Sequence, residues 1–387
     1  MSMQRIPYRT IGIVGGGQLG LMLCDVARRM ALKTVVLDAN PQAPALRRAD
    51  ETVIADLFDR AGLRELCDRS DIVTFEIEHT DTGALSDFAS EGRAVIAPSP
   101  AVLERIRDKA LQRKTLARHD VPQPRYVLWD EPSESPPDGM AFPFVQKLRT
   151  GGYDGRGVAV LQDPASSRLQ GASIAEELVD LEVELAVIVA RSGDPATGET
   201  RDMRSYAPVR MDFDSSLNIC TRVVAPSGVS ATVERRAIAI AEAAVAAFGI
   251  VGVCAVELFV AADGRILVNE LAPRPHNSGH LTIEAHATSQ FEQHLRAVCG
   301  LPLGSPELLR PAVMLNLLGG AHSGLPVCRG YHELHAIPET RLHWYDKSPC
   351  APGRKMGHIT CLGDTVEEAM KRADQAEGLF ALDGSSD

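Results

Sequence analysis

The sequence predicts an α/β protein that begins with a parallel sheet. Residues 10–14 (TIGIV) have the character of a short buried strand, and a glycine turn and a helix with apolar residues at helical spacing follow. Residues 33–37 (KTVVL) form the next strand. Strand, helix and strand within about 30 residues indicate a βαβ unit. With further strands at residues 72–75 and 95–97, this first domain is expected to span residues 1–105.

A small, mostly antiparallel domain is expected over residues 106–190. A helix at residues 101–119 leads into it, and the proline-rich stretch 130–143 is a loop because proline lacks an amide donor. Its strands are predicted at residues 144–148, 158–161, 173–177 and 184–190.

The third domain is expected to span residues 191–387, after the turn-rich connector 192–200. It should contain long strands and an alanine-rich helix at residues 233–248. The tail, GLFALDGSSD, is expected to be loose.

Composition and charge exclude several classes of protein. The 387 residues carry a net charge of −11, which gives no general attraction to nucleic acid or to an anionic membrane. No apolar run reaches the roughly 20 residues of a membrane span, and the N-terminus does not resemble a signal peptide. The eight cysteines are scattered without a C-x-x-C pair, so we expect reduced thiols in a cytoplasmic protein without a zinc site.

The first candidate site is the turn GGGQLG, in which Gly15, Gly17 and Gly20 match G-x-G-x-x-G. Asp38 lies where an acid would bind a ribose in a dinucleotide site, so an NAD-linked dehydrogenase is one open interpretation. Gln18 is distinctive because it places a side-chain amide at the tip of the turn.

The second candidate site combines Lys147, at the end of a strand, with the loop TGGYDGRG. Glycines favour a mobile flap whose amides could cover phosphates, while the lysine holds the α- and β-phosphates. A merely flexible hairpin is the alternative, but it leaves Tyr153, Asp154 and Arg156 unexplained.

The third candidate site is a pair of carboxylates on neighbouring strands, CAVELFV and RILVNEL. A two-residue turn at Asp263 and Gly264 pairs Val260 with Leu267, and Glu257 with Glu270. Facing carboxylates repel, so the arrangement requires either a cation between them or protonation of one of them. Oxygen-only ligands suit Mg²⁺, with a nucleotide phosphate completing its coordination. A longer loop that separates the pair is the alternative.

Two further loops concentrate polar residues. APRPHNSGH, residues 272–280, follows the second acidic strand directly, and HWYDKSPCAPGRKMGH, residues 343–358, contains Lys347, Arg354 and Lys355. In an acidic chain the second loop is a candidate phosphate clamp; a solvated basic patch is the alternative.

The combination resembles the ATP-grasp superfamily. GGGQLG, TGGYDGRG, NELAPRPHNSGH and WYDK…PGRKMGH, in this order, further resemble the 5-(carboxyamino)imidazole ribonucleotide synthase family over about residues 10–362. The resemblance implies a Rossmann-like pre-ATP-grasp domain, a small α+β lid domain, a larger α+β C-terminal domain and a homodimer. It also implies that ATP activates bicarbonate as carboxyphosphate, which then carboxylates 5-aminoimidazole ribonucleotide in purine biosynthesis.

The resemblance also assigns residues. Lys109 and Lys147 match cationic ATP ligands, residues 152–158 the flap, residues 176–179 the adenine-binding backbone and Glu184 a ribose acceptor. The ATP site that the resemblance implies comprises Lys109, Lys147, Gly152, Tyr153, Asp154, Gly155, Arg156, Gly157, Val158, Glu176, Glu177, Leu178, Val179, Glu184, Asn269 and Glu270.

For magnesium the resemblance implies Glu257 and Glu270. The residues expected to act on the reacting groups are Tyr153, Asp154, Arg156, Arg274 and His276. Those expected to bind the ribonucleotide are Gln18, Leu19, Glu76, Asn277, Ser278, Lys347, Arg354 and Lys355.

Two positions depart from the family pattern. Residues 211–213 read Met-Asp-Phe where an Asn-x-His is common, so we expect a changed nucleotide contact. Ala272 stands where many relatives have an asparagine, which leaves the metal fewer protein ligands.

Three other functions stay open at this point. An ATP-grasp enzyme with another acceptor, such as formate-dependent glycinamide ribonucleotide transformylase or biotin carboxylase, shares the flap and the acids but should lack the HNSGH and PGRKMGH strings. A dehydrogenase explains only the first domain. A non-catalytic nucleotide-binding module would tolerate the loss of Glu270.

Overall fold

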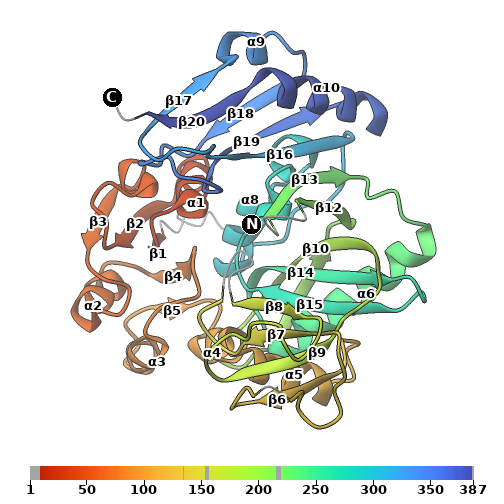
Figure 1. Cartoon of the computed structure of the whole chain (residues 1–387). Coiled ribbons are helices and arrows are strands. Elements are labelled where there is room, and N and C mark those ends of the chain that lie inside the picture. The colour runs from red at the N-terminus through yellow and green to blue at the C-terminus, as the bar shows by residue number, and fades with distance from the viewer. Residues whose placement is uncertain (1–8, 134, 153–156, 215–218, 386–387) are drawn as a thin grey trace.

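The computed structural model describes residues 9–133, 135–152, 157–214 and 219–385. Figure 1 shows the N-terminal sheet in red and orange on one side, the small sheet in yellow below, and the C-terminal elements in blue at the top. Among the described helices, none is long and apolar enough to cross a membrane.

The N-terminal sheet is parallel, with strand order β3-β2-β1-β4-β5, as the βαβ pattern predicts. Its first strand and its fourth have the predicted bounds. The elements of this region are β1 (Thr10–Val14), α1 (Gln18–Arg29), β2 (Lys33–Asp38), η1 (Pro44–Arg47), β3 (Glu51–Ile54), α2 (Arg60–Asp68), β4 (Ile72–Phe75), α3 (Thr82–Ser90) and β5 (Val95–Ile96).

The single helix expected at residues 101–119 is wrong, because the chain breaks at Asp108. That residue has extended backbone angles and separates α4 (Pro100–Arg107) from α5 (Lys109–Arg118). Its carboxylate accepts hydrogen bonds from the amides of Ala110 and Leu111, so Asp108 caps the second helix. The break places Lys109 at the first residue of α5.

The small sheet is antiparallel, with order β6-β9-β7-β8. Its strands are β6 (Tyr126–Trp129), β7 (Phe144–Leu148), β8 (Val158–Leu161) and β9 (Ser173–Glu177). Three of the predicted strands match, but the prediction that residues 184–190 complete this sheet is wrong. They belong to β10 (Leu181–Gly193), which pairs with β14 in the large sheet.

The large sheet has nine strands, arranged as β15-β14-β10-β12-β13-β16-β19-β18 with β11 also paired to β10. All of its pairings are antiparallel. Its other strands are β11 (Thr200–Ser205), β12 (Val209–Asp214), β13 (Ile219–Ala225), β14 (Gly252–Ala261), β15 (Ile266–Ala272), β16 (Ala312–Leu318), β18 (Thr340–Trp344) and β19 (Lys355–Leu362).

Helices cover the large sheet, and a small ribbon closes the chain. The helices are α6 (Ala231–Phe248), η2 (Asn277–Gly279), α7 (Thr282–Ala285), α8 (Gln290–Val298), α9 (Tyr331–His335) and α10 (Val366–Leu379). The expectation of a loose tail is wrong, because β20 (Ala381–Ser385) pairs with β17 (Leu325–Arg329). All eight cysteines are free, and of these only Cys328 is exposed.

A shared core joins the N-terminal sheet to the rest of the chain. Apolar residues of α1 pack with Phe291 and Leu295 of α8. Buried His294 adds a polar link: its Nδ1 accepts the Val253 amide at 3.0 Å, so its protonated Nε2 donates to Thr74 Oγ1 at 2.7 Å. The N-terminal region is thereby joined through α8 to β14 of the large sheet.

Candidate active site

Two cavities of about 610 and about 370 Å³ meet between the three sheets. The larger lies against the small sheet and the hairpin β14–β15, and the smaller extends to the ends of β1 and β4. Both are lined by Glu78, Gly152, Glu270, Arg274, His276, Asn277 and Lys355. The shared lining makes them two compartments of one site.

The hairpin brings Glu257 and Glu270 opposite each other, as predicted, but by a different route. The loop has three residues instead of two and ends at Gly264, whose φ of 81° is left-handed. Val260 therefore pairs with Ile266, and the predicted pairing with Leu267 is wrong.

A β-bulge restores the acidic pair. Leu258 pairs with Val268 and Glu257 with Glu270, so Asn269 is an extra residue on β15. Both Asn269 and Glu270 consequently line the larger cavity. The bulge thus adds a side-chain amide to the two carboxylates.

The two carboxylates differ in protonation. Burial raises the pKa of Glu257 to about 8, and the charges of Glu270 and Glu184 add to the effect. Burial alone would also raise the pKa of Glu270, but Lys109 Nζ, 3.0 Å from Glu270 Oε2, keeps it below its ordinary value. The pKa values of two neighbouring carboxylates separate in this way when no cation lies between them.

Lys147 lies behind the bulge in a buried ion pair. Its Nζ is 2.8 Å from Glu176 Oε2 and donates to Asn269 Oδ1 at 2.9 Å. Burial lowers the pKa of Lys147 although Glu176 opposes the shift. Burial alone would raise the pKa of Glu176, but Arg113 and Lys147 lower it to about 2. Arg113, which sequence reasoning missed, is the second partner of this acid, at 2.6 Å.

The larger cavity has an apolar end next to β9. Leu178 and Val179, which follow that strand, line it together with Met211 and Phe213, which stand where the family pattern has Asn and His. Glu184 lies on the same wall, and burial raises its pKa to about 7. This end combines apolar side chains with one acid, a lining that could accommodate an aromatic base and the hydroxyl groups of its sugar.

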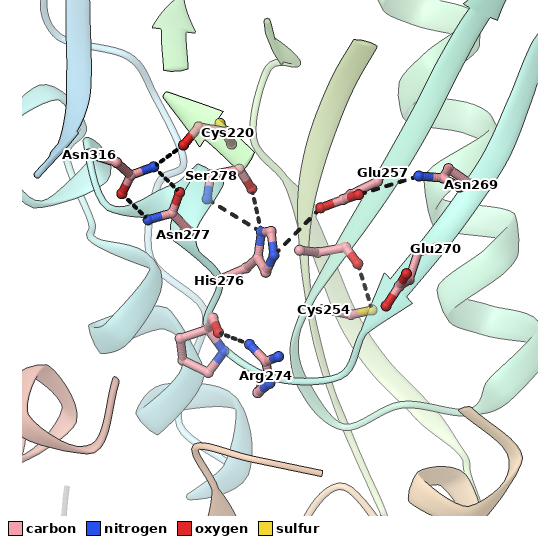
Figure 2. A network of polar contacts seen from close by, with 12 residues as sticks. Cys220, Cys254, Glu257, Asn269, Glu270, Arg274, His276, Asn277, Ser278 and Asn316 are labelled. Atoms are coloured by element: carbon pink, nitrogen blue, oxygen red, sulfur yellow. Dashed lines mark hydrogen bonds and ion pairs between the residues drawn. The ribbon is translucent and has the colours of Figure 1, made fainter. Parts of the chain in front are cut away.

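His276 faces Glu257 with a defined tautomer. Its Nδ1 accepts the backbone amide of Ser278 at 3.3 Å, so the proton lies on Nε2, 3.5 Å from Glu257 Oε1. Figure 2 shows Glu257 between His276 and Asn269. Asn277 exchanges two hydrogen bonds with Asn316, of 2.7 and 2.8 Å, which anchor this loop to β16.

Arg274 is paired with Glu78, a residue that sequence reasoning missed. Its Nε donates to Glu78 Oε2 at 2.6 Å, and burial alone would raise the pKa of Glu78, but Arg274 lowers it. Glu78 follows β4, at the carboxyl end of a parallel strand, where ligand sites of such sheets usually lie. That position is the feature of the sequence from which a role for Glu78 could have been predicted.

Backbone amides of the glycine turn in the first domain donate hydrogen bonds to carboxylates of the protein itself. The amides of Gly17 and Gly20 donate to Glu76 at 2.7 and 2.6 Å, and the amide of Gly16 donates to Asp38 at 2.7 Å. A dinucleotide pyrophosphate would need those amides. The dehydrogenase interpretation is therefore wrong on structural grounds.

Gln18, Leu19 and Glu76 instead line the smaller cavity. Of the predicted clamp, Lys355 lines both cavities, whereas neither Lys347 nor Arg354 is among their lining residues. Lys347 Nζ donates to the Lys355 carbonyl at 3.0 Å. The flap residues Tyr153, Asp154, Gly155 and Arg156 lie outside the described residues.

Three family models match successive parts of the chain. A ribonucleotide synthetase preATP-grasp domain matches residues 8–107, an ATP-grasp domain residues 114–291, and a phosphoribosylaminoimidazole carboxylase C-terminal domain residues 312–372.

Full-length relatives agree. The N5-carboxyaminoimidazole ribonucleotide synthase of Synechococcus elongatus is 39% identical, with 97% of this chain and 94% of the relative covered. The Bacillus subtilis enzyme of that name is 36% identical, with 95% of each chain covered.

Solved structures of this family have the same fold as this chain. The synthetase from Thermotoga maritima has a TM-score of 0.88 and 40% identity over 97% of this chain and 100% of that chain. The Aspergillus clavatus synthase in complex with ADP and 5-aminoimidazole ribonucleotide has a TM-score of 0.84 and 33% identity over 96% and 99%. The chain belongs to the N5-carboxyaminoimidazole ribonucleotide synthase family of ATP-grasp ligases.

Proposed function

We propose that the protein carboxylates 5-aminoimidazole ribonucleotide with bicarbonate at the expense of ATP. An oxygen of bicarbonate attacks the γ-phosphorus, and ADP leaves, which gives carboxyphosphate. The exocyclic amine then attacks the carbonyl carbon, the bond from that carbon to the phosphate oxygen breaks, and the amine loses a proton. The products are N5-carboxyaminoimidazole ribonucleotide, ADP and phosphate.

The two compartments fit the two nucleotides. The larger cavity, with its apolar end and Glu184, suits the adenosine of ATP, and Lys147 and Lys109 would meet its phosphates. The smaller cavity, with Gln18, Leu19 and Glu76, suits the ribonucleotide. Because the cavities share Arg274 and Lys355, an anion formed between them would meet two cations.

Glu257 and Glu270 would hold Mg²⁺. The facing acids, one of them protonated near neutral pH without a cation, provide the hard oxygen ligands that this ion prefers. Among the described residues, no group of three or more His, Cys, Asp or Glu side chains could hold a metal, so phosphate and water oxygens would complete the shell. When bound, the ion neutralises charge on the transferred phosphoryl group.

The chain's own residues would orient the intermediates and manage proton transfer. Arg274, held by Glu78, would bind the bicarbonate-derived anion, and His276 presents the proton of its Nε2 toward the same space. Residues 152–158 would exclude water, which otherwise hydrolyses carboxyphosphate. The roles of Tyr153, Asp154 and Arg156 in this flap, and those of Asn277, Ser278, Lys347 and Arg354 toward the ribonucleotide, stay predictions.

The observation that carries the proposal is the acidic pair at the junction of two cavities in a chain of this family. Phosphate release from ATP, assayed with and without 5-aminoimidazole ribonucleotide and bicarbonate, tests it. Stimulation that needs both co-substrates is expected; formate- or biotin-dependent ADP formation would favour another acceptor. The free cysteines support a cytoplasmic location, and a homodimer is proposed from the family resemblance.

A further inference from the structure

A buried arginine outside both cavities contacts the candidate site from behind. Arg113 of α5 is 2% exposed and is not among the residues that line either cavity. Its Nε donates to Glu176 at 2.6 Å, and its Nη1 and Nη2 donate to the carbonyls of Val268 and Asn269, both at 2.8 Å. One guanidinium thus ties α5 to β9 and to the bulge of β15.

The two carbonyls belong to the bulge that completes the acidic pair. Val268 pairs with Leu258 and Asn269 is the extra residue, so their peptide groups set where Glu270 emerges. A planar guanidinium presents its donors in a rigid fork that spans two carbonyls and a carboxylate, whereas an ammonium group is a compact point charge on a flexible stem. Arg113 therefore fixes the backbone from which Asn269 and Glu270 enter the larger cavity.

The same contacts set the charge behind that cavity. Glu176 lies between Arg113 and Lys147, so two cations and one anion leave one net positive charge next to the cavity wall. Without the arginine charge, Glu176 would neutralise Lys147 alone. The attraction of this wall for a polyanion would then be weaker.

We propose that Arg113 is a positioning residue with two separable effects: it holds the bulge that presents the metal-binding acids, and it leaves Lys147 with an uncompensated charge for the phosphates of ATP. The inference rests on the proposed function. It predicts that charge and geometry can be tested apart, because lysine keeps the charge of Arg113 but not its fork of donors.

The experiment compares Arg113→Gln and Arg113→Lys with wild type in the full-length protein. Rates of ADP formation are measured against ATP, and against free Mg²⁺ at saturating ATP. Arg113→Gln should raise both the KM for ATP and the Mg²⁺ concentration for half-maximal rate at least tenfold. Arg113→Lys should bring the KM for ATP to within threefold of wild type while the Mg²⁺ requirement stays at least fivefold higher.

Arg191 provides a matched control. It is 1% exposed, donates to the carbonyls of Ile250 and Gly198, and lies on β10 outside both cavity linings. Arg191→Lys should lower the thermal midpoint but leave both kinetic constants within twofold of wild type.

Three results would overturn the inference. They are an unchanged Mg²⁺ requirement in folded Arg113→Lys, a KM for ATP that lysine does not restore, and an equal Mg²⁺ shift in Arg191→Lys. Should Arg113→Gln not fold, the Mg²⁺ requirement of Arg113→Lys still decides. A wild type without ribonucleotide-dependent ADP formation would instead refute the proposed function itself.

Discussion

Glu257→Gln should stabilise the metal-free protein at alkaline pH while it removes most turnover. The Glu257 side chain is 22% exposed, and its pKa is raised from 4.5 to about 8 in the folded chain. The folded state therefore binds more protons than the unfolded state between these two values, and stability falls as the pH rises through that window. Glutamine has the shape of the protonated acid and cannot ionise.

The magnitude follows from the two pKa values. One pKa unit corresponds to about 1.4 kcal/mol, so ionisation of Glu257 costs about 1 kcal/mol at pH 5 and about 4 kcal/mol at pH 8. A chain of 387 residues has an unfolding entropy of about 0.8 kcal/mol/K. The thermal midpoint of Glu257→Gln minus that of wild type should thus be about 4 °C larger at pH 8 than at pH 5.

The assay is thermal unfolding in EDTA at both pH values, with Glu182→Gln as the control. Glu182 is an exposed carboxylate on β10, so its replacement controls for the loss of one surface charge. Added Mg²⁺ and ADP should stabilise wild type more than Glu257→Gln. A shift of Glu257→Gln that does not depend on pH would refute the reasoning.

Three more substitutions test other parts of the site. Glu176→Gln breaks a buried ion pair with Lys147, so urea unfolding should show a loss of about 3–5 kcal/mol; a loss under 1 kcal/mol would contradict the pairing. Gly17→Ala places a Cβ 2.2 Å from Glu76 Oε1, so the KM for the ribonucleotide should rise at least tenfold with the KM for ATP unchanged; equal effects on both would count against the assignment. Lys355→Ala should lower kcat/KM for the ribonucleotide about 10- to 100-fold, measured from initial rates, and unaltered kinetics would remove it from the anion site.

Local patterns predicted most of the fold, since strand periodicity and glycine turns are properties of short segments. The strands at residues 10–14 and 144–148 and the acidic pair were found in this way. Sheet membership was harder. Residues 184–190 have the pattern of any buried strand, and only their tertiary pairing with β14, β12 and β11 assigns them to the large sheet.

The site was predictable where residues of one loop or hairpin act together, and was not where distant segments meet. Counting residues outward from the predicted two-residue turn pairs Glu257 with Glu270. The pairing is correct only because the extra residue Asn269 offsets a loop that is one residue longer than expected. Arg113 donates to the Val268 carbonyl across 155 residues of sequence, and Glu78 accepts from Arg274 across 196. No periodicity or spacing within a segment encodes such contacts.

The central claim is that bicarbonate is activated by phosphoryl transfer at the junction of the two cavities. Incubation with ATP, 5-aminoimidazole ribonucleotide and ¹⁸O-labelled bicarbonate, with mass analysis of the released phosphate, tests it directly. Carboxyphosphate predicts one ¹⁸O atom in each phosphate, because the bridging oxygen stays with phosphorus. Unlabelled phosphate formed together with the carboxylated product would contradict the account.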